Sequence, residues 1–369
     1  MREPANQQAN PKVDRPLATW LFVVAGMVLV MVVLGGLTRL THSGLSMVEW
    51  QPVTGWLPPL TSAEWQAAFD AYRQSPEYLK INAGMTLTGF QEIFWLEYVH
   101  RLWGRLIGVA FFVPGVWFAI LGRIDRRLAV KLAGLFVLGG LQGALGWFMV
   151  QSGLVDRPDV SQYRLAAHLG FAVLIYGAIL WIAFGLWRRG PGTRTAALPA
   201  REHGYAAALC GLIFVAIIAG AFVAGTDAGF AYNTFPLMDG DLVPPHLLAS
   251  SPWYFSFFED ITTIQFTHRV LATASLLAAL TLAARLHRHP GDVRRAGWIL
   301  AACALGQFTL GALTVVLIVP VPIAALHQAG AVVLWSAALW TAFVTAARRQ
   351  GTVATVPART VAVDRGATV

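Results

Sequence analysis

Residues 17–38 read LATWLFVVAGMVLVMVVLGGLT, a run that contains no charged side chain. About 20 predominantly apolar residues span the hydrocarbon core of a bilayer. Backbone polar groups in lipid must be satisfied within the segment itself, and a helix satisfies them. We therefore expect this run to form a transmembrane helix.

Seven further apolar runs of similar length follow along the chain, at residues 93–121, 129–151, 163–187, 205–226, 262–284, 296–318 and 322–347. The composition agrees with this pattern, because 56% of the 369 residues are hydrophobic and 12% are charged. Soluble domains carry about a quarter charged residues, and a transmembrane β-barrel shows short alternating segments instead. The sequence predicts an all-α integral membrane protein with eight transmembrane helices.

The positive charges indicate how these helices are oriented. The net charge is +8, and Lys and Arg gather in the flanks on one side of the predicted bundle. The opposite loops hold only Arg73, Lys80 and Arg157. Because Lys and Arg mark the cytoplasmic side, we expect both termini in the cytoplasm and the loops 41–90 and 228–261 outside. The basic excess thus indicates topology and lipid contact, and no nucleic acid partner is expected.

The N-terminal residues favour a bacterial membrane over that of an organelle. They do not resemble the Arg-rich, acid-free transit peptide of an organelle protein, and the first apolar run is too long for a cleaved signal peptide. We expect a multi-pass protein of the bacterial inner membrane.

Short motifs recur in the same order in the two halves of this chain, which indicates a duplicated four-helix unit. The matched pairs are Thr41–Gly44 with Thr226–Gly229, Glu97–Arg101 with Gln265–Arg269, Gly143-Ala-Leu with Gly311-Ala-Leu, and His168 with His327. This pattern predicts two tandem four-helix bundles, 17–190 and 200–347, related by a pseudo-two-fold axis along the membrane normal. The segments 1–16 and 348–369 would be cytoplasmic tails, the second disordered.

The first outer loop is predicted to contain a helix. Thr61-Ser-Ala-Glu64 has the pattern of a capping box. Trp65, Phe69 and Tyr72 then follow at helical spacing. An amphipathic helix lying at the outer interface fits this pattern.

Four histidines carry the chemistry that the sequence predicts. They are His100, His168, His268 and His327, one near the outer end of each even-numbered transmembrane helix. A single one could be a histidine hydrogen-bonded to a neighbouring helix. Four ionisable side chains in repeat-matched positions within a membrane indicate a functional site.

Haem iron fits this arrangement better than zinc does. Zinc prefers three or four clustered ligands, usually with cysteine or carboxylate. Pairing within each repeat gives His100 with His168, and His268 with His327. Two imidazoles on opposite sides of a macrocycle make a bis-histidine haem site, so the sequence predicts one haem per unit.

Three further residues lie beside these predicted ligands. Arg101 and Arg269 directly follow a ligand and could pair with haem propionates, to which arginine binds with bidentate geometry. Glu97 lies one helical turn before His100, and its counterpart in the second unit is the neutral Gln265. One unit therefore has an acid–base group near its haem, and we predict that Glu97 is catalytic.

At these residues the chain resembles the haem A synthase family, in the branch found in proteobacteria and mitochondria. The matching stretches are GGLTRLTHSGLSM at 35–47, IFWLEYVHR at 93–101, YRLAAH at 163–168, AFVAGTDAGFAYNTFPLM at 221–238, and His268-Arg269. The resemblance extends over all eight predicted helices, 17–347. Another branch of the family carries a cysteine pair in the first outer loop, and this chain has none there.

The resemblance implies a division of labour between the two units. The first would hold the substrate, haem O, on His100 and His168, and the second a permanent haem b on His268 and His327. The implied reaction oxidises a ring methyl of haem O to a formyl group, which gives haem A for cytochrome oxidase. The expected partners are a haem O synthase, oxidase assembly factors and membrane lipid, while assembly into a homo-oligomer stays open.

Two other classes of protein share some of these features. A di-haem, cytochrome b-type electron-transfer protein accounts for the four histidines, but not for Glu97 opposite Gln265. It would also place its haems at two depths to carry electrons across the membrane. A transporter is suggested by the duplication, but transporters bind substrate near the midplane at broken helices.

Overall fold

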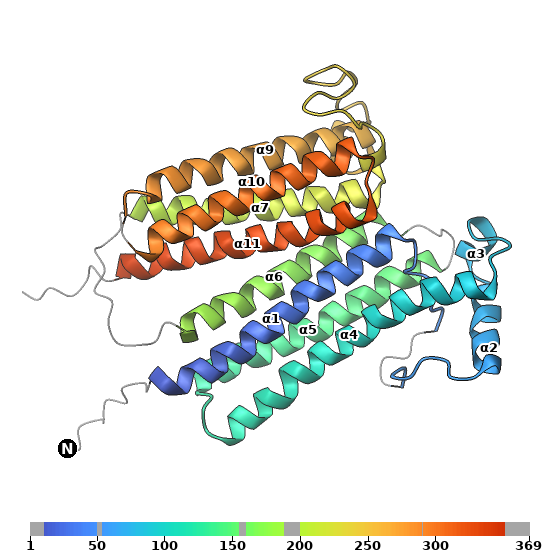
Figure 1. Ribbon diagram of the computed structural model, residues 1–369, viewed down its shortest axis with the longest axis horizontal. Coiled ribbons are helices and arrows are strands. Elements are labelled where there is room, and N and C mark those ends of the chain that lie inside the picture. Colours follow the sequence, from blue (N-terminus) through green and yellow to red (C-terminus); the bar gives the residue numbers. More distant parts are fainter. Residues whose placement is uncertain (1–10, 50–53, 155–159, 188–199, 290, 351–369) are drawn as a thin grey trace, which may run out of the picture.

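The computed structural model describes residues 11–49, 54–154, 160–187, 200–289 and 291–350 (Figure 1). Within these ranges, eight helices are long and apolar enough to cross a membrane. They are α1 (Pro11–Leu40), α4 (Leu87–Ile120), α5 (Arg126–Gly153), α6 (Gln162–Trp187), α7 (Ala200–Gly225), α9 (Ile261–Leu286), α10 (Asp292–Val316) and α11 (Val321–Gln350). The chain is therefore an all-helical, multi-pass membrane protein, as its apolar runs predicted.

The long helices lie side by side in two groups of consecutive elements (Figure 1). The first group is α1, α4, α5 and α6, and the second is α7, α9, α10 and α11. They meet where α6 packs against α7 and where α1 packs against α11. The pseudo-two-fold relation between the groups stays a prediction.

Polar contacts join the two groups inside the bundle. The hydroxyl groups of Tyr176 and Ser336 lie 2.7 Å apart. Gln328 donates to the carbonyl of Val32 at 3.0 Å. Such hydrogen bonds between helices are worth about 1 kcal/mol in a membrane, so the interface is specified by shape and packing more than by these bonds.

The start of α1 and the end of α11 lie at the same end of the bundle, and the long loops lie at the other end (Figure 1). This arrangement follows from the even number of spans. Which end faces the cytoplasm stays a prediction. The predicted tails lie largely outside the described residues, although α1 already begins at Pro11 and α11 continues to Gln350.

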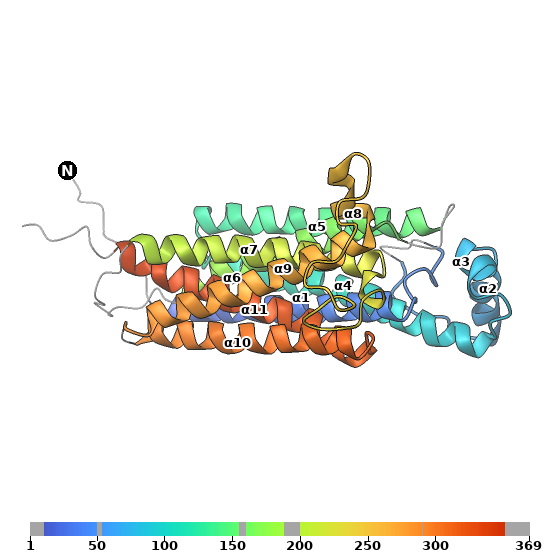
Figure 2. The same cartoon turned by 90° about the horizontal axis from the view of Figure 1, so that it is seen from above.

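Helix α4 begins at Leu87, earlier than the predicted start at 93. The side chain of Thr86 caps it by accepting a hydrogen bond from the backbone N–H of Gly89 at 3.2 Å. The added turns reach past the other helices towards the outer segments (Figure 2). His100 consequently lies further from the start of its helix than the sequence predicted.

Two short helices, α2 (Ser62–Tyr72) and α3 (Pro76–Lys80), form a cap on the N-terminal end of α4 (Figure 1). The predicted capping box between Thr61 and Glu64 is present. Phe69 and Tyr72 face Phe90, with ring centres 5.2 and 5.1 Å away. Burial raises the pKa of the Tyr72 phenol. The second outer loop carries three short elements, η1 (Ala228–Phe230), η2 (Trp253–Phe255) and α8 (Ser256–Glu259).

Candidate functional site

Each of the four predicted histidines lies against a glycine of a neighbouring helix. A Cβ atom added to Gly146, Gly220 or Gly311 would lie 2.9, 2.9 or 2.8 Å from the imidazole Cε1 of His168, His268 or His327, respectively. A real Cβ atom essentially never lies this close to another heavy atom, so each ring occupies space that glycine leaves open. Of these glycines, the sequence analysis had singled out only Gly311, as part of the repeated motif and not as a neighbour of histidine.

The fourth contact is looser. A Cβ on Gly35 would lie 3.4 Å from Nε2 of His100, which is ordinary van der Waals distance. The helix α1 thus gives His100 a glycine neighbour without confining the ring. This looseness sets His100 apart from the other three.

His268 and His327 lie next to each other in the second helix group, in an edge-on arrangement. Their ring centres lie 6.4 Å apart, and the ring planes are turned by 81°. Nδ1 of His268 lies 3.1 Å from the carbonyl oxygen of Ala216, one turn before Gly220 on α7. The backbone acceptor places the ring proton on Nδ1 and leaves Nε2 as a lone-pair donor.

His100 and His168 occupy the first helix group. His168 lies close enough to His100 for the two imidazoles to interact electrostatically. Among the described residues, however, their rings do not form a contact pair like that of His268 and His327. The first pair is therefore less closely set than the second.

Two glutamines complete the histidine surroundings. Nε2 of Gln142 lies 3.0 Å from Nδ1 of His168, and Nε2 of Gln307 lies 3.1 Å from Nδ1 of His327. The Oε1 atoms of both glutamines are buried and have no partner among the described residues. Each glutamine precedes its glycine by four residues and so shares its helix face.

These contacts correct the register of the internal repeat. The sequence matched Gly143 with Gly311 because both begin Gly-Ala-Leu. By their contacts with histidine, Gly146 corresponds to Gly311 and Gln142 to Gln307. The signal that could have found both residues is a recurring Gln-x-x-Leu-Gly, at 142–146 and 307–311.

Glu97 is buried, with 2% of its surface exposed, and ties the first outer loop to α4. Its Oε1 accepts from Nη2 of Arg101 at 2.6 Å and from Nε at 3.0 Å. Its Oε2 accepts from the Ser46 hydroxyl at 2.7 Å and from the Met47 N–H at 2.8 Å. Both carboxylate oxygens thus serve as acceptors for a loop and a cation.

Arg101 also reaches the same loop, donating to the carbonyls of Met47 and Glu49 at 2.8 and 3.0 Å. Arg269 does the equivalent in the second group, where its guanidinium donates to the carbonyls of Tyr232, Thr234 and Leu237 at 2.8 to 3.2 Å. The predicted contact of both arginines with propionates stays a prediction.

Gln265 takes the place of Glu97 in the second group, where its Oε1 accepts a long hydrogen bond of 3.5 Å from Nη2 of Arg269. Its Nε2 donates to the carbonyl of Tyr232 at 3.2 Å, whereas the first loop presents the Ser46 hydroxyl and the Met47 N–H to Glu97. Each loop therefore matches the side chain that it meets. The difference between carboxylate and amide is built into the surroundings.

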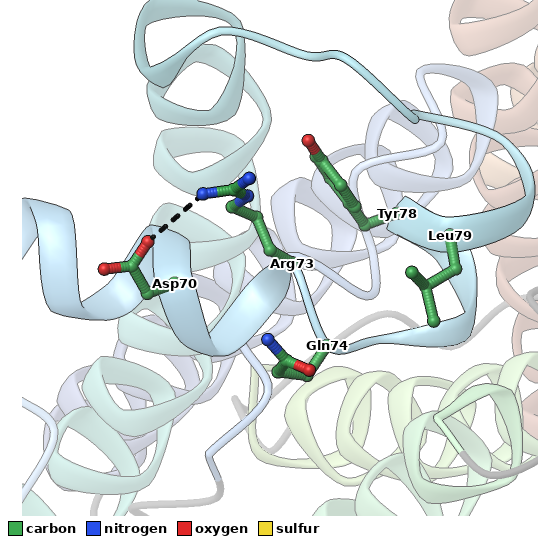
Figure 3. Close-up of a pocket in the computed structure, with 5 residues that line it drawn as sticks. All are labelled: Asp70, Arg73, Gln74, Tyr78 and Leu79. Carbon is green, nitrogen blue, oxygen red and sulfur yellow. Dashed lines mark ion pairs between the residues drawn. The ribbon is translucent and has the colours of Figure 1, made fainter.

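No group of three or more His, Cys, Asp or Glu side chains gathers in the described ranges to hold a metal ion. Iron held by two imidazoles needs no such group. A hollow of about 380 Å³ lies instead on the outer cap, away from the histidines (Figure 3). It is lined by Asp70, Arg73, Gln74, Tyr78 and Leu79, and it is not the predicted site.

The fold and the histidines define a multi-span membrane protein whose helices carry imidazoles packed on glycine. A family model described as COX15-CtaA, cytochrome oxidase assembly protein, matches residues 18–339. The chain belongs to this family.

Curated relatives agree with the family match over most of the chain. A protein of Nitrosospira multiformis named heme A synthase is 49% identical over 330 residues, covering 89% of this chain and 93% of its own length. Proteins of the same name from Rhodospirillum centenum and Parvibaculum lavamentivorans are 49% and 51% identical. They cover 91% and 88% of this chain, and 90% and 92% of their own lengths.

The glycine contacts generate a test of whether the imidazole positions matter. We expect Gly220→Ala and Gly311→Ala to displace the rings of His268 and His327, because overpacking of this kind costs about 1–3 kcal/mol. Bound haem per protein, measured by absorbance after purification, should fall sharply. Gly35→Ala is the matched control and should bind normally, since its Cβ fits. Equal haem content in all three variants would contradict this account.

Proposed function

We propose that this chain is a haem A synthase, an enzyme that oxidises a ring methyl of haem O to a formyl group. The family match and the name shared by its relatives support the activity. The observation in the structure that carries the proposal is the neighbouring pair His268 and His327, whose ring centres lie 6.4 Å apart. The haem A produced would supply cytochrome oxidase.

The second histidine pair fits a resident haem b. Two imidazoles bound on opposite sides of one metal ion, at metal–nitrogen distances of about 2 Å, have ring centres about 6 Å apart. The observed separation agrees with this value. The bond from His268 to the Ala216 carbonyl leaves Nε2 available for iron. When bound, haem b supplies one-electron redox chemistry.

Arg269 could hold an anionic group of that haem. Its Nε is buried and has no partner among the described residues, while its Nη atoms bind loop carbonyls. A buried, unpaired guanidinium donor is costly, and a propionate would satisfy it. Arg101 would serve the first haem from the corresponding position on α4.

The first pair, His100 and His168, is the proposed site of the substrate haem O. The looser contact of His100 with Gly35, and the absence of a ring contact among the described residues of this pair, support a site that exchanges its occupant. A substrate must arrive and a product must leave at each turnover. A resident cofactor needs neither step.

Glu97 is the proposed catalytic residue, acting at the substrate methyl. Oxidising a methyl group beside the ring develops positive charge on the carbon and releases protons. A carboxylate could stabilise that charge or accept a proton, and both effects raise rates substantially. Arg101, Ser46 and Met47 hold this carboxylate in one orientation.

The cellular setting follows from the same proposal. We place the protein in the bacterial inner membrane with both termini in the cytoplasm, because its basic residues gather in the flanks at the end where α1 starts and α11 ends. A haem O synthase would deliver the substrate, and oxidase assembly factors would receive the product. A di-haem cytochrome would not account for a carboxylate at Glu97 opposite the neutral Gln265.

The ligand assignment is tested by four single variants. His268→Ala and His327→Ala should lose haem b, because each removes one of the two side chains proposed to bind its iron. His100→Ala and His168→Ala should retain haem b but convert little haem O. Absorbance spectra and chromatography of extracted haems separate these outcomes. Wild-type haem spectra in all four variants would refute the assignment.

The role of Glu97 is tested by two variants that affect the same contacts differently. Glu97→Gln removes the charge, and we expect it to keep haem b and accumulate haem O while haem A formation falls by about 10²–10⁴-fold. Ser46→Ala removes one loop bond but keeps the carboxylate, so it should retain most activity. Comparable losses in both variants would show that Glu97 only positions the loop, and near-normal haem A yield from Glu97→Gln would remove its catalytic role.

A further inference from the structure

Gln307 lies at the second histidine pair in a position that the proposed reaction does not use. It stands one turn before Gly311 on α10, so its side chain and the His327 ring meet on the same helix face. Its amide nitrogen lies 3.1 Å from Nδ1 of His327. Its amide oxygen is buried and has no partner among the described residues.

The unpaired oxygen of Gln307 indicates what this side chain would do when a haem is bound. An imidazole that binds iron through Nε2 carries its proton on Nδ1, and that proton needs an acceptor. The oxygen and nitrogen of a glutamine amide exchange places when the amide turns by 180°. In the turned orientation Oε1 accepts the proton of His327, which satisfies the ring and the oxygen and places the amide nitrogen where the oxygen had been.

We propose that Gln307 is a positioning residue for the resident haem, accepting the Nδ1 proton of His327 and so fixing Nε2 towards the iron. This inference rests on the proposed function, which places haem b between His268 and His327. It gives His327 the same tautomer that the Ala216 carbonyl gives His268. Both axial ligands are then held by an acceptor from a neighbouring helix.

Gly330 provides the space that this amide occupies. It lies three residues after His327 on α11, and a Cβ atom there would collide with Oε1 of Gln307. The side chain of Gln307 is flexible at its end, so an added methyl group would push the amide aside. Gly330 therefore offers a way to displace the amide without removing it.

The first helix group lacks this arrangement, which makes it an internal comparison. Nε2 of Gln142 lies 3.0 Å from Nδ1 of His168, but the same nitrogen also donates to the backbone carbonyl of His168 at 3.0 Å. Turning this amide would bring two oxygens together. Among the described residues, no acceptor is bonded to the ring of His100. Among the described residues, an acceptor for Nδ1 of both histidines is therefore available in the second pair and not in the first.

The consequence is a measurable effect on haem b itself. An acceptor at Nδ1 makes the imidazole more basic, which favours ferric over ferrous iron and lowers the reduction potential. Replacing Gln307 by leucine removes the acceptor at nearly equal volume. A tenfold loss of ferric preference corresponds to a rise of 59 mV for one electron.

The experiment is a spectroelectrochemical titration of haem b in the purified, membrane-solubilised protein, with haem retention measured in parallel. Gln307→Leu and Gly330→Ala should both raise the midpoint potential, by an amount on the order of a tenfold change in the ferric-to-ferrous ratio. Both should release haem b to apomyoglobin faster, by about 10–100-fold. Gln142→Leu is the matched control and should leave the haem b potential unchanged.

The outcomes separate the inference from the function on which it rests. If the wild-type protein holds haem b but Gln307→Leu changes neither its potential nor its release, Gln307 does not position His327. Equal shifts in Gln307→Leu and Gln142→Leu would also overturn the inference, because they would reflect packing alone. If the wild-type haem content is unaffected by His327→Ala, the proposed function fails instead.

Discussion

A polar ring inside a membrane must find its partners within the protein, because lipid offers none. In this chain His268 finds its partner at the carbonyl of Ala216, and His168 and His327 find theirs at Gln142 and Gln307. Each of these rings also lies against a glycine of a neighbouring helix, where the missing side chain leaves room. The contact fixes how closely adjacent helices approach and which way each ring faces. The rest of the site depends on it, since a ring displaced by one methyl group could no longer face its partner across a macrocycle.

The outer ends of the helices are organised by a second set of contacts. Arg101 and Arg269 each donate to backbone carbonyls of the loop that follows the preceding span. Each arginine thus ties its loop to the helix that carries His100 or His268. The two loops differ where it matters for chemistry, because one offers donors to the carboxylate of Glu97 and the other offers a carbonyl to the amide of Gln265.

The asymmetry between the two helix groups agrees with a division between substrate and cofactor. In the second group both rings have an Nδ1 partner from another helix, and their centres lie 6.4 Å apart. In the first group the glycine contact of His100 is looser. A closely set pair suits a haem that stays, and a looser pair suits one that is replaced at each turnover.

The sequence predicted the eight spans well because apolar length alone decides whether a helix crosses a bilayer. It placed the start of α4 too late, because residues 87–92 lie outside the apolar run and their helix depends on the Thr86 cap. It also misaligned the repeat by three residues. The match rested on Gly-Ala-Leu at Gly143 and Gly311, whereas the glycine that contacts histidine in the first group is Gly146.

Contacts between distant segments were beyond the reach of the sequence. The bond from Ser46 to Glu97 and the contact of Gln307 with His327 depend on how loops and helices fold together. Periodicity along one helix carries no information about either contact.

The central claim is that the four histidines hold two different haems. It is tested most directly by extracting the pigments from the purified protein and identifying them by chromatography and mass spectrometry. The account predicts haem b together with haem O or haem A. Haem b alone would favour an electron-transfer cytochrome, and a protein without haem would contradict the account altogether.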